Sequence, residues 1–129
     1  VVIDTSPYPD TETARAQTLV LRHRDANGVF NKSMTEQLAA TCDAAGVSYQ
    51  YKDDYIHEQN RLLAAEGKTL RSLGSTEMGR IIAASGGLVD GTTLQVPTTG
   101  YHTMDESASL VACEAFLDVL CRLAQIQPK

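Results

Sequence analysis

Hydrophobic and polar positions along this chain switch repeatedly between a strand-like and a helix-like period. Short apolar runs rich in β-branched or aromatic residues predict strands at residues 1–5, 18–22, 47–51 and 92–96, the last closed by Pro97. The segments between these runs are longer and more polar, and most of them carry a helical pattern.

The helices are predicted from apolar spacing and from capping residues. One helix begins at Ser33, because the hydroxyl of Ser33 and the carboxylate of Glu36 have the spacing of a capping box. Further helices are expected at residues 54–66, after Glu77, and at about 105–126. Strands and helices therefore alternate, which favours an α/β domain with a three-layer α/β/α sheet.

Two segments carry more specific expectations. Residues 6–16 contain two prolines and show no periodicity, so we expect a loop there. The final helix has an apolar stripe, which predicts packing on the sheet or on a neighbouring subunit. The residues of this stripe are Leu110, Leu117, Leu120 and Ala124.

The chain contains three cysteines, which is an odd number at wide spacing: Cys42, Cys113 and Cys121. Their spacing includes no CxxC pair and no Cys/His pair of the kind that holds zinc. Cys42 and Cys113 fall on apolar faces of expected helices. The pattern predicts buried, reduced thiols in a cytoplasmic protein.

Length and charge narrow the class of protein. The 129 residues suffice for one domain, and the formal net charge of −5 argues against a nucleic-acid partner. No apolar stretch reaches the length of a membrane span, so no membrane partner is expected. The chain opens at Val1 inside an apolar run and without methionine, which suggests a fragment of a longer polypeptide.

His102 is the foremost candidate for chemistry. It follows the strand that ends at Pro97 and a short Thr/Gly turn, a position where α/β sheets bind ligands. Imidazole is also the commonest metal ligand and transfers protons near neutral pH. Asp105 and Glu106 could orient the ring, or they could complement the dipole of a helix that starts there.

Asp4 is the second candidate, because it is a carboxylate near the end of an apolar strand. Such a residue is either a ligand-binding group or an ordinary turn aspartate. If the two strands are parallel, Asp4 and His102 lie at the same edge of the sheet.

A turn of small residues, Gly74-Ser75-Thr76, leads through Glu77 into a helix at Met78 and Gly79. Backbone N–H groups at such a turn can bind an anion such as a substrate carboxylate. The turn has neither the lysine of a P-loop nor the glycine spacing of a dinucleotide site. Nucleotide binding is therefore not expected.

The other histidines have simpler interpretations. His57 lies near Asp53, Asp54 and Glu58 in sequence, and this polar group is expected to form the solvated face of a helix. His23 lies between two arginines near a strand end and is expected to be structural. No Gly-x-Ser-x-Gly motif is present, so a serine nucleophile has no support.

Taken together, these motifs resemble the C-terminal part of the co-catalytic dizinc aminopeptidases. The glutamyl/leucyl-type deblocking (tetrahedral) aminopeptidases are most similar, and the aspartyl aminopeptidases are near relatives. The resemblance rests on the strand with Asp4, the run ending at Asp25, the Gly74–Gly79 turn and the Val96–Thr103 segment. It spans residues 1–129 as one domain, apart from an insertion at about 53–73.

The resemblance implies that Asp4 binds one metal ion and His102 the other, while Gly74, Ser75 and Thr76 contact the substrate. The cofactors would be two divalent ions, zinc first, with cobalt or manganese as alternatives. A water between the two ions would attack a peptide carbonyl. The resemblance also implies a peptide substrate and homo-oligomers of the full-length protein.

The same resemblance places the general-base glutamate and the remaining metal ligands upstream of Val1. Since a catalytic zinc takes three protein ligands, the chain alone is expected to bind zinc poorly and to be inactive. The deblocking family has aspartate where Glu77 stands, so no role is assigned to Glu77. Two alternatives stay open: a related zinc amidohydrolase or carboxypeptidase, and a non-catalytic α/β assembly module.

Overall fold

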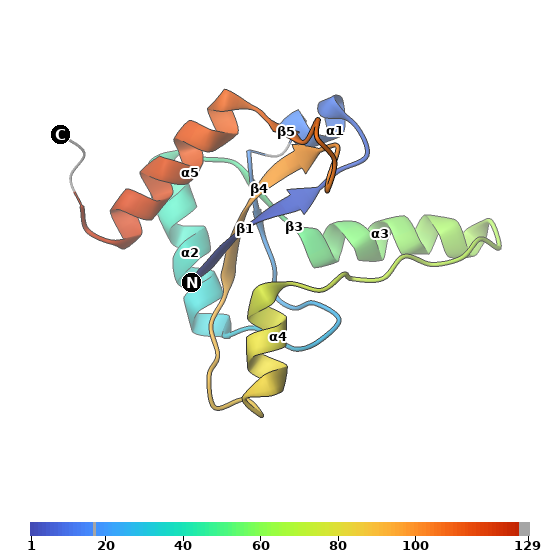
Figure 1. Cartoon of the computed structure of the whole chain (residues 1–129), viewed down its shortest axis with the longest axis horizontal. Coiled ribbons are helices and arrows are strands. Elements are labelled where there is room, and N and C mark those ends of the chain that lie inside the picture. The colour runs from blue at the N-terminus through green and yellow to red at the C-terminus, as the bar shows by residue number, and fades with distance from the viewer. Residues whose placement is uncertain (17, 127–129) are drawn as a thin grey trace.

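The computed structural model describes residues 1–16 and 18–126 as a mixed α/β domain (Figure 1). The described residues contain five strands: β1 (Val2–Pro7), β2 (Leu19–Leu21), β3 (Tyr49–Tyr51), β4 (Thr93–Thr99) and β5 (Ser107–Ala108). They also contain five helices: α1 (Thr11–Ala16), α2 (Lys32–Ala45), α3 (Lys52–Ala65), α4 (Glu77–Ala84) and α5 (Leu110–Leu123). The expectation of an α/β fold is therefore confirmed.

The strands form one open, mixed sheet in the order β1-β4-β2-β3. β1 is parallel to β4 and β2 is parallel to β3, but β2 is antiparallel to β4. β5 adds an antiparallel pair at the end of β4. The carboxyl ends of the two parallel pairs therefore point in opposite directions, so strand ends on β1 and β2 do not meet at one edge.

Two apolar clusters pack against opposite faces of the central strand β2, because successive side chains of a strand alternate between faces. Leu19 and Leu21 belong to one cluster, together with residues of α2 and α5. Val20 belongs to the other, with Tyr8, with Ala14 of α1 and with Tyr55 of α3. All three β2 residues are completely buried. Helix α3 continues beyond this contact and projects from the body of the molecule (Figure 1).

The prediction of a loop at residues 6–16 is wrong, because β1 continues to Pro7 and α1 follows it. The side chain of Asp10 accepts a hydrogen bond from the N–H of Thr13 at 2.7 Å, and its carbonyl accepts one from Ala14. An aspartate in this position satisfies N–H groups that the first helical turn leaves unpaired. Burial of Ala14 then holds this short helix against the sheet.

Strand β4 passes through Pro97 and ends at Thr99, so the prediction that proline closes it is also wrong. β4 bonds to β2 at Gln95 and to β5 from Thr98 onward. Pro97 has no N–H to donate to a neighbouring strand. It lies between the residues through which β4 pairs with β2 and with β5, so neither described pairing loses a hydrogen bond.

Helix α2 starts one residue before the predicted capping box. Its N-cap is Asn31, whose side chain accepts a hydrogen bond from the N–H of Met34 at 2.9 Å. Ser33 therefore lies in the first turn. At the other end, Gly46 adopts the left-handed conformation (φ 67°) expected of the glycine that stops a helix.

Helix α5 begins at Leu110 with Ser109 as its cap, so Asp105 and Glu106 lie in an exposed loop and not in its first turn. Two leucines of the predicted apolar stripe do not pack on the sheet, since Leu110 is 80% and Leu117 63% exposed. The alternative, packing on a neighbouring subunit, stays a prediction. The residues that α5 buries fully are Ala112 and Val119.

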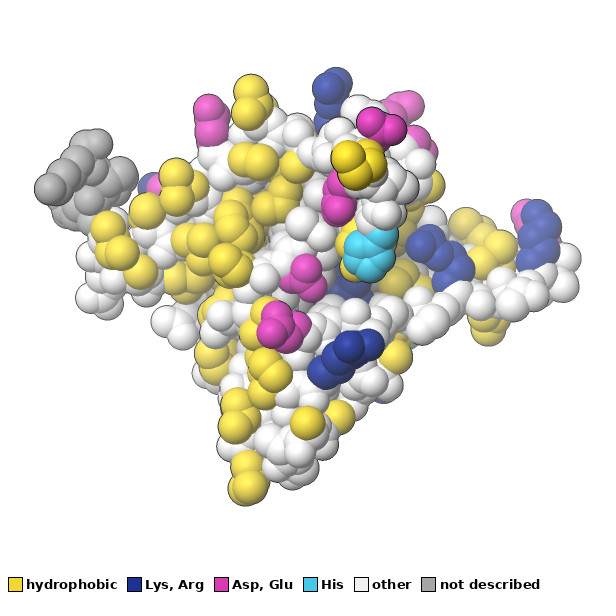
Figure 2. Space-filling model, in the orientation of Figure 1, with side chains coloured by type: hydrophobic (Ala, Val, Ile, Leu, Met, Phe, Trp, Pro, Cys, Tyr) yellow, Lys and Arg dark blue, Asp and Glu magenta, His cyan; other side chains and the backbone are white. Residues whose placement is uncertain are grey.

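Cys113 is exposed on α5, contrary to the expectation of a buried thiol, whereas Cys42 on α2 is buried as predicted. Hydrophobic side chains gather along α5 on the visible face of the molecule (Figure 2). Within residues 1–16 and 18–126, no helix combines the length and the apolar character needed to cross a membrane.

Candidate functional site

Asp4 lies in the middle of β1, not at its end as the sequence suggested, because the strand runs on to Pro7. Its direct neighbour on β4 is Gln95. One carboxylate oxygen, Oδ1, accepts a hydrogen bond from the N–H of Thr5 at 2.7 Å. The residue is half-buried, and among the described residues no hydrogen bond is assigned to its second oxygen, Oδ2.

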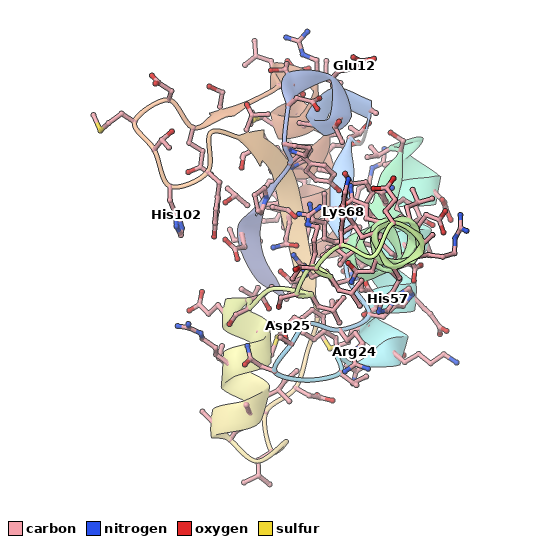
Figure 3. The ribbon with its side chains drawn as sticks, turned by 90° about the vertical axis from the view of Figure 1, so that its right-hand side faces the viewer. Glu12, Arg24, Asp25, His57, Lys68 and His102 are labelled. Atoms are coloured by element: carbon pink, nitrogen blue, oxygen red, sulfur yellow. The ribbon has the colours of Figure 1, made fainter. Side chains whose placement is uncertain are left out.

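His102 lies in the loop that joins β4 to β5, three residues after the last residue of β4. Its backbone has φ 60°, a left-handed conformation that is unfavourable for a non-glycine residue. The ring of Tyr101 stacks on the imidazole with centroids 3.8 Å apart and an angle of 21° between the planes. The imidazole is exposed, and Figure 3 shows it at the tip of its loop beside the edge of the sheet.

The pairing of β1 with β4 relates the two predicted metal ligands. The strands are adjacent and parallel over the whole of β1, from Val2↔Thr93 to Pro7↔Thr98. The loop of His102 leaves β4 at this same end and returns to it through β5. Asp4 and His102 therefore belong to neighbouring elements, but Asp4 lies within its strand and not at the strand end where the sequence placed it. Their joint binding of metal stays a prediction.

The two acidic residues expected to orient His102 have other contacts. Glu106 accepts a hydrogen bond from the hydroxyl of Thr98 at 3.0 Å, which ties the loop to β4. The backbone of Asp105 bonds to Thr103 and Ser107. Neither carboxylate makes a described hydrogen bond to the imidazole. The loop is therefore held mainly by its own backbone and by Thr98.

The Gly74–Gly79 turn is fixed against the loop that follows β2. The carbonyl of Gly74 accepts from the N–H of Ala26 at 2.9 Å, and the hydroxyl of Ser75 accepts from Asn27 at 2.7 Å. Thr76 donates both its N–H and its hydroxyl to the buried carboxylate of Asp25, at 2.7 and 2.8 Å. Because the N–H of Thr76 is already used, substrate binding by this turn would need its other groups, and it stays a prediction.

Sequence reasoning assigned no role to Asp25, which was named only as the end of one run that carries the family resemblance. It is completely buried and also accepts hydrogen bonds from the N–H groups of Asn27 and Gly28. The sequence signal was the Asp-x-Asn-Gly turn. Its second role, as the partner of a threonine 51 positions later, depends on the fold.

A second buried polar group lies on the same face of the sheet as Asp4. Arg22 donates from Nε to the side-chain oxygen of Gln95 at 2.8 Å and from Nη1 to the carbonyl of Leu73 at 2.7 Å. Burial lowers the pKa of Arg22, while the charges of Asp25, Asp53 and Asp4 act in the opposite direction. Sequence reasoning did not single out Arg22 or Gln95.

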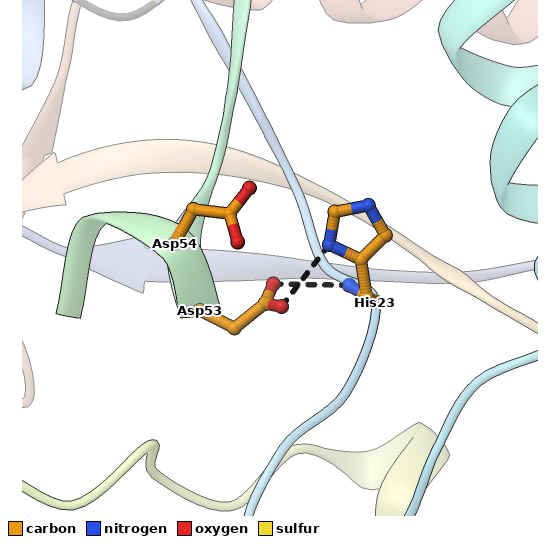
Figure 4. A group of neighbouring side chains, drawn as sticks. All are labelled: His23, Asp53 and Asp54. Atoms are coloured by element: carbon orange, nitrogen blue, oxygen red, sulfur yellow. Dashed lines mark hydrogen bonds and ion pairs between the residues drawn. The ribbon is translucent and has the colours of Figure 1, made fainter. Parts of the chain in front are cut away.

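The predicted solvated face at the start of α3 is wrong at Asp53, which is buried and contacts His23. Asp54, His57 and Glu58 are exposed as predicted. Asp53 accepts from both the N–H and Nδ1 of His23, at 3.0 and 3.1 Å (Figure 4). Potential ligand atoms of His23, Asp53 and Asp54 lie within 4.8 Å of one another, a donor set that a divalent cation could share. Tyr51 stacks on the imidazole at 3.9 Å. These contacts join the end of β2 to the start of α3, which supports the expected structural role of His23.

Lys52 is a buried cation at the start of α3. Its Nζ donates to the carbonyl of Pro7 at 2.5 Å and lies 3.4 Å from the ring centroid of Tyr8. Burial, followed by the charges of Arg22 and Arg71, lowers the pKa of Lys52 to about 7.

Comparison of the chain with protein-family models, with curated protein sequences and with solved structures found no match. The assignment of function therefore depends on the residues and geometry described above.

Proposed function

We propose that this chain is the C-terminal part of the catalytic domain of a metal-dependent aminopeptidase, with a three-layer α/β/α fold. The observation that carries the proposal is the parallel pairing of β1 with β4. Asp4 lies on β1, and His102 lies in the loop that follows β4. It rests further on the resemblance of both motifs to those of the dizinc aminopeptidases.

The donor chemistry of the two residues suits divalent zinc, which binds carboxylate oxygen and imidazole nitrogen. Asp4 offers Oδ2, because Oδ1 accepts from Thr5. His102 offers an exposed imidazole on a backbone held at positive φ. A left-handed conformation at a non-glycine residue costs about 1–3 kcal/mol and is found preferentially at functional sites.

In this proposal each residue of the chain has a limited task. Asp4 and His102 hold two different metal ions, and the Gly74–Thr76 turn contacts the peptide. The pair of ions, when bound, lowers the pKa of a water for attack on the peptide carbonyl. The resemblance assigns the general base and the remaining ligands to a segment upstream of Val1.

The test is metal analysis and peptidase activity of the complete protein carrying His102→Ala or Asp4→Asn, with His57→Ala as the matched control. His57 is exposed on α3, away from β1 and β4. Each site variant is expected to lose about one metal ion per chain and nearly all activity, and the control should lose neither.

Unchanged metal content in both site variants would contradict the proposal and would favour a non-catalytic assembly module. Hydrolysis of small acylated amino acids but not of N-terminal peptide bonds would instead identify a related amidohydrolase or carboxypeptidase.

A further inference from the structure

Hydrogen bonds link the segment after β2, through Gln95 of β4, to the backbone of Thr5 on β1, and Thr5 in turn bonds the carboxylate of Asp4. Arg22 of the segment after β2 donates to Gln95 Oε1 at 2.8 Å. Gln95 Nε2 then donates to the carbonyl of Thr5 at 3.0 Å, and the N–H of Thr5 donates to Asp4 Oδ1 at 2.7 Å. The groups that flank Asp4 are therefore tied to a side chain two strands away.

The chemistry of the end groups fixes the orientation of the Gln95 amide. A guanidinium only donates and a carbonyl only accepts, so the amide oxygen must face Arg22 and the amide nitrogen must face Thr5. Gln95 is 1% and Arg22 4% exposed. At this depth an amide turned the other way would leave two buried groups without partners, which is costly. The amide therefore has one stable position.

The far end of the network is anchored as well. Arg22 Nη1 donates to the carbonyl of Leu73, in the segment that leads into the Gly74–Gly79 turn. Asp25, three residues after Arg22, holds the same turn through Thr76. The network thus connects β1 to the segment that bears the proposed substrate-contacting residues.

We propose that Gln95, oriented by Arg22, is a positioning residue for Asp4. By holding the carbonyl of Thr5, it fixes the backbone of Thr5, whose N–H in the preceding peptide group occupies Oδ1. Oδ2 is thereby presented to a divalent cation in one orientation. This inference rests on the proposed function, in which Asp4 is a metal ligand. Removal of a group bonded directly to a metal ligand typically changes metal affinity about 10–100-fold, and since Gln95 acts through the Thr5 backbone we expect the lower end of this range.

The chain offers a matched control on the same strand. Thr93 is completely buried, precedes Gln95 by two residues and so faces the same side of β4. Its hydroxyl donates to the carbonyl of Val2 on β1 at 3.0 Å. Thr93→Val therefore removes a buried side-chain bond from β4 to β1, but not the one beside Asp4.

The experiment measures zinc affinity of the complete protein by competition with a chelator, together with the visible spectrum of the Co²⁺-substituted protein. Gln95→Met is expected to weaken zinc binding at least 10-fold and to shift the Co²⁺ bands. Excess zinc should restore its kcat with an unchanged KM. Thr93→Val is expected to leave zinc affinity and the spectrum as in the wild type.

Equal effects of Gln95→Met and Thr93→Val on zinc affinity, or no effect of either, would overturn the inference. Asp4→Asn separates this result from a failure of the proposed function. If Asp4→Asn loses metal while Gln95→Met binds it normally, only the positioning role is wrong. If Asp4→Asn also keeps its metal, the proposed function fails, and the inference fails with it.

Discussion

The carboxylate of Asp25 accepts two hydrogen bonds from Thr76, one from its N–H at 2.7 Å and one from its hydroxyl at 2.8 Å. The Thr76 hydroxyl in turn accepts from the N–H of Gly79 and so caps α4. One buried carboxylate thereby fixes the loop after β2, the small-residue turn and the start of a helix.

Asp25→Asn should destabilise the protein by about 3 kcal/mol or more, because the new amide group would place a donor against donors at a fully buried site. Thr76→Val should cost about 2 kcal/mol through loss of the cap and of one bond to the carboxylate. Thr76→Ser keeps both interactions and should cost less than about 1 kcal/mol. Urea denaturation measures all three, and equal losses for Val and Ser would contradict the role of the hydroxyl.

Gly79→Ala tests how closely α4 approaches Asp25. A Cβ at Gly79 would overlap both carboxylate oxygens, so the helix or the carboxylate must move. We expect a loss of about 2–4 kcal/mol, although alanine is the better helix former by about 1 kcal/mol. Gly28→Ala is the control, because its Cβ would meet only the side chain of Ile82 at 3.2 Å. A thermal shift no larger for Gly79→Ala than for the control would contradict this packing.

The lowered pKa of Lys52 predicts that the stability of the protein depends on pH. Its pKa is about 7 in the folded protein, against 10.5 ordinarily, so between these values the unfolded chain binds a proton that the folded chain does not. The free energy of unfolding should therefore rise with pH above about 7, by at most about 1.4 kcal/mol per pH unit. The useful window is pH 7–9, because burial raises the pKa of Cys42 to about 11, and stability falls above the ordinary thiol value of 9.0.

Denaturation at several pH values should show this slope in the wild type and lose it in Lys52→Met. Lys32→Met is the control, since the side chain of Lys32 is 88% exposed, and it should keep the slope. A slope that survives in Lys52→Met would mean that another group causes it. A wild type without the slope would mean that the contacts of Lys52 with Pro7 and Tyr8 keep the ammonium charged after folding.

The thiols should differ in reactivity. Under native conditions iodoacetamide is expected to modify Cys113 well before Cys42, because Cys113 is exposed while burial disfavours the thiolate of Cys42. Mass spectrometry of the labelled peptides gives the order. Equal labelling at both sites in the folded protein would contradict the burial of Cys42, and labelling in denaturant provides the reference.

Local patterns in the sequence determined much of the secondary structure. The apolar runs near Leu19, Tyr49 and Leu94 became strands, and α3 matches its predicted bounds within two residues. These predictions held because strand periodicity and helix-breaking glycines act over a few residues. The start of α5 was missed, because Asp105 and Glu106 resemble a first helical turn and only the pairing of β5 with β4 keeps them out of it.

The tertiary structure alone decided the direction of the strands and the partners of the polar side chains. The antiparallel pairing of β2 with β4 could not be deduced from the sequence, because every strand has the same apolar signal in either direction. The sequence by itself identified Asp4, His102 and the Gly74–Thr76 turn as candidate residues. Only the fold placed Gln95 beside Thr5 and Asp25 beneath Thr76, since hydrogen bonds between distant residues follow from packing and leave no local pattern.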